Sequence, residues 1–123
     1  MRTPKLVVAL NAVTATTTSS AINIKGAKKV SILCTRANHV AGSTAFSVEG
    51  SIDDGTTYVA TNIVDHAVNT NGQTVTRSAS KTLSANGTAW IALDLEYLAF
   101  DWIKVTATET TDGTHSASVY ITY

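Results

Sequence analysis

Few residues in this chain could serve as acids, bases, nucleophiles or metal ligands. Its 123 residues include three histidines and one cysteine: His39, His66, His115 and Cys34. The histidines are far apart and have no cysteine or second histidine at the spacing of a metal site, so each is interpreted as a solvated side chain in or beside a loop or strand end. Cys34 alternates with Val30 and Ile32, which predicts a buried thiol whose reactive thiolate is disfavoured.

The sequence contains no complete set of catalytic groups. Asp65 and His66 are adjacent and could orient one another, but catalysis by such a pair also needs a nucleophile and an oxyanion donor. No Gly-x-Ser-x-Gly elbow is present to supply a serine nucleophile. We therefore expect a protein that is not an enzyme.

Two adjacent aspartates, Asp53 and Asp54, are the best candidates for calcium ligands. Three further carboxylates could join them, those of Asp94, Glu96 and Asp101. Calcium takes about six to eight oxygen ligands, and no Asp-x-Asp-x-Asp loop is present to supply them. Turn formation explains the aspartate pair more simply. We therefore expect no metal ion and no cofactor.

The composition and net charge of the chain argue against some classes of binding partner and favour others. Hydrophobic residues make up 44% of the chain and charged residues only 15%, and nine basic residues balance nine acidic ones. A nucleic-acid-binding protein would carry a basic stripe with interleaved aromatic residues, so we expect no nucleic-acid partner. Thr and Ser fill the polar positions in place of Lys and Glu, and such a surface does little to repel neighbouring copies. This composition favours a protein that works in an assembly.

The start of the chain carries no recognisable targeting signal. Residues Met1–Pro4 precede an apolar run, Leu6–Leu10, that is too short for a signal-peptide core or a membrane span. The single cysteine cannot form an intrachain disulfide, so no oxidising compartment is implied. We therefore expect synthesis in a cytoplasm and no membrane partner.

Antiparallel β structure is the clearest prediction from the sequence. Four residue pairs supply the positive φ angles of tight turns: Asp54-Gly55, Asn71-Gly72, Asn86-Gly87 and Asp112-Gly113. Apolar and polar residues alternate between these turns, most clearly over 44–52, whereas residues 61–73 are expected to form a long Asn-rich loop. Any helix should be limited to about one turn within 94–100. About eight short strands predict a single all-β domain over 1–123, an antiparallel β-sandwich for which a jelly roll is one arrangement.

Neighbouring strands are expected to pair as hairpins: 21–25 with 30–37, 44–52 with 56–60, 74–83 with 88–95, and 101–109 with 115–123. In the last hairpin, a three-residue loop ending at Gly113 places Ile103 opposite Ile121, because a one-residue slip would turn every apolar side chain to the other face. Gly113 then takes the left-handed conformation of a bulged loop. By the same rule Tyr58 lies opposite Gly50, where its ring can cover the bare glycine.

Two aromatic residues and the N-terminal segment are the candidates for a binding surface. Trp102 and Tyr120 alternate out of phase with the core residues of their strands, and the expected register places them diagonally on one outer face. Such rings are enriched at protein contacts, so they are expected to form a rigid anchor unless the Asn-rich loop covers them. The segment Met1–Lys5, with the cations Arg2 and Lys5, is expected to order as an arm on a partner, the alternative being a frayed terminus.

Two stretches of the chain resemble small bacteriophage virion proteins. The first is Phe46-Ser-Val-Glu-Gly-Ser-Ile-Asp-Asp-Gly-Thr-Thr-Tyr58, which is similar to a V-x-G-S-x-D-G-x-T-aromatic hairpin of that family. The second begins with Phe100-Asp-Trp-Ile-Lys-Val105, which is similar to an aromatic-x-x-I-R/K-V strand of that family. It continues through the glycine-containing turn Asp112-Gly113-Thr114 and ends at Val119-Tyr-Ile121. The chain departs from the pattern by one extra residue before Asp54-Gly55, and by Lys104 where arginine is common.

The resemblance spans about residues 44–123, and it implies a β-sandwich that acts as a capsid decoration (cement) protein or as another small head or tail component. The implied partners are the major capsid protein and other copies of this chain, on the surface of a virion. A discoidin-like carbohydrate-binding module is the alternative, because its V-x-x-S-x-D-G-x-x-W strand is similar, with Tyr58 here in place of the usual Trp.

Overall fold

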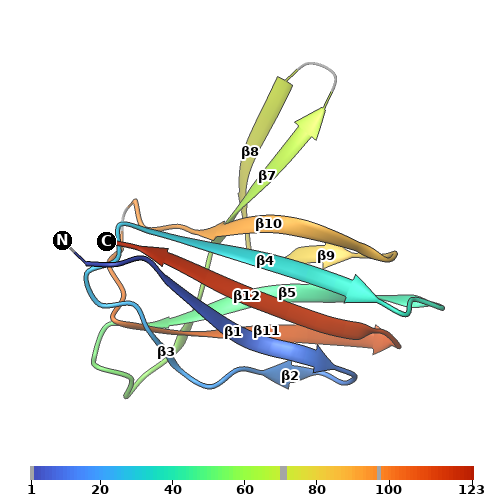
Figure 1. Cartoon of the computed structure of the whole chain (residues 1–123), viewed down its shortest axis with the longest axis horizontal. Helices are drawn as coiled ribbons and strands as arrows, with labels where there is room; N and C mark the ends of the chain where they lie inside the picture. Colours follow the sequence, from blue (N-terminus) through green and yellow to red (C-terminus); the bar gives the residue numbers. More distant parts are fainter. Residues whose placement is uncertain (1, 70–71, 97) are drawn as a thin grey trace.

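In the part of the chain that the structure describes, all of the regular structure consists of β-strands, which form two packed layers (Figure 1). The computed structural model describes residues 2–69, 72–96 and 98–123. The strands among these residues are β1 (Lys5–Val13), β2 (Thr17–Thr18), β3 (Ile22–Asn23), β4 (Lys29–Ala37), β5 (Gly42–Ser51), β6 (Val59–Thr61), β7 (Ile63–Asn69), β8 (Gly72–Ser78), β9 (Lys81–Leu83), β10 (Gly87–Leu93), β11 (Trp102–Thr111) and β12 (Thr114–Thr122). The described residues contain no helix, and so none that could cross a membrane.

Both layers are antiparallel sheets, as the sequence predicts. Sheet A has six strands in the order β1-β12-β4-β10-β7-β8. Sheet B has the order β2-β11-β5-β6, and the short strands β3 and β9 add to β11 and β5. The all-β sandwich is therefore confirmed, with more strands than the eight expected because several of them have only two or three residues.

The core lies between the two sheets and is built from alternate residues of the long strands. In β4, Val30, Ile32 and Cys34 point inward and are buried, which confirms the predicted burial of the thiol. Burial raises the pKa of Cys34 to about 12, so the thiol is neutral. From sheet B, Phe46 of β5 and Ile103 of β11 are equally buried. Alternation thus predicted the inward faces correctly, because it depends only on the pleat of each strand.

The expected hairpin of the last two strands does not form. β11 pairs with β5 in sheet B, while β12 pairs with β4 and β1 in sheet A, so the chain crosses from one layer to the other at Asp112-Gly113. Ile103 lies opposite Gly50, and Ile121 lies opposite Val30. Both isoleucines do face the core, but from opposite sheets. The predicted register is therefore wrong, although Gly113 has the predicted positive φ, of 123°.

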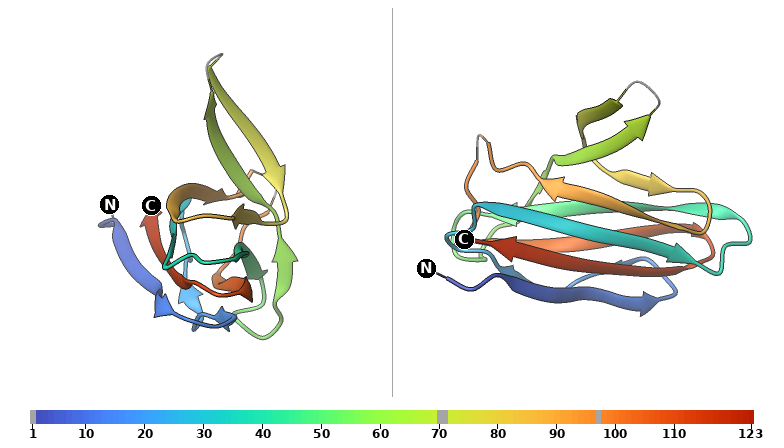
Figure 2. Two further views of the ribbon diagram at one scale, coloured as in Figure 1. Left: turned by 90° about the vertical axis from the view of Figure 1, so that its right-hand side faces the viewer. Right: turned by 45° about the horizontal axis from the view of Figure 1, so that its top comes forward.

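Two other expected hairpins are wrong for the same reason. β3 pairs with β11, whereas β4 lies in the other sheet. β9 pairs with β5, whereas β10 pairs with β4 and β7. The expected Asn-rich loop over 61–73 also does not exist as such, because most of its described residues belong to β6, β7 and β8. β7 and β8 form a hairpin that rises away from the sandwich (Figures 1 and 2).

The hairpin of β5 and β6 is confirmed, with a register shifted by one residue. Asp54 and Gly55 have φ angles of 59° and 84°, the positive values expected of this turn. Gly50 lies opposite Val59 rather than Tyr58. The ring that covers Gly50 belongs to Phe100, whose atoms occupy the place of a side chain at that position.

Candidate functional site

The outer face of sheet A exposes large apolar side chains on four of its strands. They are Leu6 and Val8 of β1 (66% and 60% exposed), Tyr120 of β12 (44%), Trp90 of β10 (61%) and Val75 of β8 (58%). We call these five residues the apolar face. Isolated exposed apolar residues are common, but a group of this kind on one sheet is typical of an interaction surface.

Strand register aligns four residues of the apolar face in two neighbouring rows. One row crosses all six strands through Leu6, Tyr120, Ser31, Ala92, Val64 and Arg77. The next row runs through Val8, Ser118, Leu33 and Trp90. Arg77, on the outermost strand, is the only charged residue in these two rows. A partner can therefore cover these two rows from β1 to β7 without desolvating a charged side chain, which would be the costly part of a contact.

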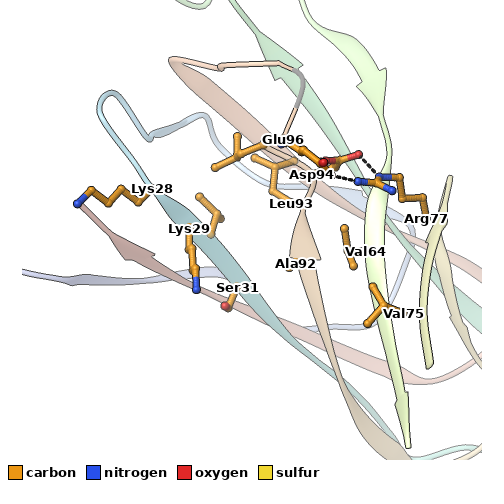
Figure 3. A pocket seen from close by; sticks show the side chains of 12 residues that line it. Lys28, Lys29, Ser31, Val64, Val75, Arg77, Ala92, Leu93, Asp94 and Glu96 are labelled. Atoms are coloured by element: carbon orange, nitrogen blue, oxygen red, sulfur yellow. Dashed lines mark hydrogen bonds and ion pairs between the residues drawn. The ribbon is translucent and has the colours of Figure 1, made fainter. Parts of the chain in front are cut away.

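A groove lies beside the apolar face, where β7 and β8 leave the sandwich. Its volume is about 430 Å³, and it lies between this hairpin and strands β4 and β10 (Figure 3). Val64, Val75 and Ala92 supply apolar lining, and Lys28 and Lys29 lie on the side of β4. The groove therefore has an apolar lining on one side and two lysine side chains on the other.

Arg77 neutralises the acidic side of this groove. Its Nε donates to Asp94 Oδ2 at 2.7 Å, and its Nη2 is paired with Glu96. The Arg77 guanidinium holds the pKa of the Asp94 carboxyl below its usual range. The two carboxylates are thus engaged within the domain, and Lys28 and Lys29 dominate the charge of the groove.

Trp102 and Tyr120, expected to share a face, lie on opposite sides of the molecule. Trp102 belongs to sheet B and Tyr120 to sheet A, and each points away from the core of its own sheet. Trp102 is half-buried, and its Nε1 donates to Asp54 Oδ1 at 3.0 Å. Lys25 Nζ lies 2.6 Å from the same oxygen, and Lys25 with Trp102 lowers the pKa of Asp54. Tyr120 therefore remains an interface candidate, whereas Trp102 is tied to a loop of its own domain.

The described part of the N-terminal segment lies against its own domain. Arg2 Nη1 donates to the carbonyl oxygen of Lys25 at 2.6 Å, and its guanidinium stacks 3.8 Å from the centroid of the Tyr123 ring. Lys5 begins β1, opposite Ile121. Arg2 and Lys5 thus flank one end of sheet A, and neither projects as a separate arm.

The candidate calcium ligands are used in local hydrogen bonds. Asp53 Oδ1 accepts from the Thr57 amide and from Ser51 Oγ, both at 2.8 Å, and these bonds lower the pKa of Asp53 to about 2. Asp101 Oδ2 accepts from the Asp54 amide at 2.7 Å. Asp94 and Glu96 are paired with Arg77, away from this turn. Within the described ranges, no group of three His, Cys, Asp or Glu residues is arranged to hold a metal ion.

A buried polar cluster closes one end of the sandwich. Arg36 Nη1 donates to Thr44 Oγ1 at 2.6 Å, Thr44 Oγ1 lies 2.8 Å from His115 Nδ1, and His115 Nε2 lies 3.1 Å from Glu109 Oε1. A hydroxyl, an imidazole and a carboxylate are also the components of a hydrolytic triad. Here the hydroxyl and the ring are both 0% exposed, so neither is accessible to a substrate. The prediction that His115 is solvated is wrong, because its side chain lies on the inward face of β12 and is buried.

Loops from different parts of the chain meet over this cluster. Asp112 accepts hydrogen bonds from the amides of Val40 and Ala41, both at 3.1 Å, and these amides, Val40 first, lower the pKa of its carboxyl. Arg36 Nη2 also contacts this carboxylate, and it lies 2.9 Å from Nδ1 of His39, which is only half-buried. The cluster therefore stabilises the loop between β4 and β5.

Asn86 and Gly87 do not form the tight turn expected of them. Neither has a positive φ, and Gly87 begins β10. Asn86 instead binds the loop over the buried cluster, because its Oδ1 accepts from the His39 amide at 2.8 Å. The other expected turn, Asn71-Gly72, and the side chain of His66 lie outside the parts of the chain that the structure describes in full.

Two features of this candidate site, Trp90 and Arg36, were not predicted from the sequence, although the strand pattern contains a signal for each. Trp90 alternates with the buried residues Ile91 and Leu93, so its outward direction could be predicted as it was for Tyr120. Arg36 stands at an inward position of the buried series that contains Cys34. A charged residue at such a position indicates a buried polar network.

No family model, curated protein or solved structure matches this chain.

Proposed function

We propose that this protein is a non-enzymatic structural component of a bacteriophage virion, a decoration protein that binds the major capsid protein through the apolar face of sheet A. The observation that carries the proposal is the exposure of Trp90, Tyr120 and their apolar neighbours on one face of sheet A. The resemblance of residues 44–58 and of the last strands to virion proteins supports the same reading. In this proposal the protein is made in the host cytoplasm and acts on the capsid surface.

A flat sheet face is well suited to a partner that presents many equivalent sites. Each buried apolar side chain contributes about 1.5–3 kcal/mol, so the face can supply a useful contact without charge pairing. A capsid presents the same surface many times, and linked copies convert a modest contact into strong overall binding. Trp90 and Tyr120 are the expected anchors, because aromatic residues dominate the energetics of such contacts.

The proposal is tested by co-sedimentation of the purified protein with capsids that lack it. Trp90→Ala should weaken binding by at least about 30-fold, which corresponds to about 2 kcal/mol. Trp102→Ala is the matched control, since its ring lies on sheet B, and it should bind as the wild type does. Both variants should remain folded by circular dichroism. Unchanged binding by Trp90→Ala would refute the role of the apolar face.

Copy number distinguishes a decoration protein from another virion component. Mass spectrometry of purified virions should find this chain in numbers comparable to the major capsid protein. A copy number far below that of the capsid protein would favour a tail or head-completion component.

A carbohydrate-binding module is the second candidate, and the exposed ring of Trp90 favours it. An indole that is 61% exposed on a sheet can stack on the apolar face of a sugar. Titration of the isolated protein with glycans, followed by tryptophan fluorescence, tests this directly. Saturable binding that Trp90→Ala abolishes would support the module over the decoration protein.

A further inference from the structure

The exposed edges of the two sheets differ in how they are blocked. An edge strand presents unpaired N–H and C=O groups that can pair with another chain, and most proteins interrupt or shorten such strands. β1, at one edge of sheet A, is interrupted by register shifts on both sides of Leu10, and Ala12 has a φ of 52°. The edges of sheet B are made from β2, β3, β6 and β9, which have only two or three residues each.

β8, at the other edge of sheet A, has none of these interruptions. Its seven residues, Gly72–Ser78, pair with β7 in an unbroken register from Ser78 opposite Ile63 to Gly72 opposite Asn69. Its sequence contains no proline. In the described chain β8 pairs with β7 alone, and Figures 1 and 2 show both strands projecting from the sandwich. The outer backbone edge of β8 is therefore regular and uncovered.

The side chains of β8 also offer little protection against pairing. Arg77 is the single charged residue of the strand, and its charge is balanced by Asp94 and Glu96. Val75, at the centre of the strand, is exposed. Lysine side chains discourage another strand from adding to an edge, and β8 has no lysine.

We propose that β8 pairs in an antiparallel manner with β8 of a second copy of this chain, about a two-fold axis at Val75. Centring the pair on Val75 lets all seven residues take part, and it joins the two A sheets into one. Arg77 then lies opposite residue 73, which is uncharged, so that like charges do not face each other. A net charge of zero also leaves little repulsion between copies. The same strand meets itself, as a two-fold interface requires.

The size of this contact predicts a weak dimer. Seven paired residues span about 24 Å, so the buried area falls below the roughly 1,200 Å² of stable complexes. We expect association in the range of about 10 μM to 1 mM for the isolated protein. This self-association is independent of capsid binding, and either can hold without the other.

Sedimentation equilibrium of the purified protein, up to about 1 mM, tests the proposal. The wild type should show a reversible dimer. Val75→Lys and Val75→Glu should each weaken it at least tenfold, because like charges then face each other at the axis. An equimolar mixture of the two variants should restore the dimer, since opposite charges then meet. Val8→Lys, a similarly exposed position on the other edge of sheet A, is the control and should dimerise as the wild type does.

Hydrogen exchange on the wild type gives a measurement that needs no substitution. Amides of β8 should gain protection as the protein concentration rises, whereas those of β1 should not. A wild type that stays monomeric to about 1 mM, Val75 variants that still dimerise, or a mixture that fails to associate would each overturn the proposal. A wild-type monomer whose β8 amides are protected only on capsids would assign the edge to the capsid protein instead.

Discussion

Replacing Arg36 by methionine should strongly destabilise the fold. The guanidinium is fully buried and donates to Thr44 Oγ1 at 2.6 Å, to the Asp112 carbonyl at 2.7 Å and to the Ala41 carbonyl at 2.9 Å. Methionine retains an unbranched apolar stem but removes the charge and all of the donors. The acceptors would then be left without their partner in a site that water cannot easily reach, which costs the desolvation of each group.

The expected cost is about 3–5 kcal/mol, because three acceptors lose their donor and each polar group left unpaired in the interior costs about 1–3 kcal/mol. In a domain of this size it corresponds to a loss of about 10–20 °C in Tm. Arg36→Lys should also destabilise, because an ammonium cannot reproduce the planar set of donors. Urea unfolding followed by tryptophan fluorescence measures the free energy of unfolding, and circular dichroism measures Tm.

Arg77→Met is the matched control. Arg77 also pairs with two carboxylates, but its side chain is 46% exposed. Exposed ion pairs contribute about 1 kcal/mol or less, so this variant should unfold close to the wild type. If Arg36→Met and Arg77→Met lose the same free energy of unfolding, burial does not determine how much these contacts stabilise the fold, and the prediction is refuted.

Three further predictions concern acid stability, a glycine and the thiol. The pKa of Asp53 is lowered to about 2 in the folded protein, so the stability it contributes is present above about pH 4 and is lost as the pH falls towards 2. Thermal melts of Asp53→Asn should therefore depend less on pH over that interval than those of the wild type, and an equal dependence would contradict the assignment. Gly50→Ala should cost about 1–3 kcal/mol because its methyl group would collide with the ring of Phe100. Gly87→Ala is the control, because no atom lies near the position of its new methyl group, and it should change the urea midpoint little. Equal losses of stability in Gly50→Ala and Gly87→Ala would show that the Phe100 ring moves aside without cost. Cys34 should react with a thiol reagent only in denaturant, since it is buried and its pKa is raised to about 12; rapid labelling of the native protein would show that the core opens.

For Trp102 and Tyr120, the alternation of apolar and polar residues predicted the direction of each side chain but not its neighbours. Both side chains were correctly predicted to point away from the core, because the direction of a side chain follows from the local pleat of its strand. Their expected common face depended on β11 and β12 being partners, and those strands lie in different sheets. The correct neighbours of Tyr120, which are Leu6 and Ser31, come from segments more than eighty residues away. Nothing in the local pattern around Tyr120 points to them.

The amino-acid sequence by itself determined the all-β class, the inward faces of the long strands, the burial of Cys34 and the turn at Asp54-Gly55. Each of these follows from a few neighbouring residues, through the two-residue period of a strand or the φ preference of a turn. Tertiary structure alone decided which strands pair, where the chain changes sheets, and that β7 and β8 project as a hairpin. The physical reason is that both sheets of a sandwich bury one face, so strands of either layer show the same alternation. Only packing of the whole chain chooses between hydrogen-bonding two such strands side by side and stacking them across the core.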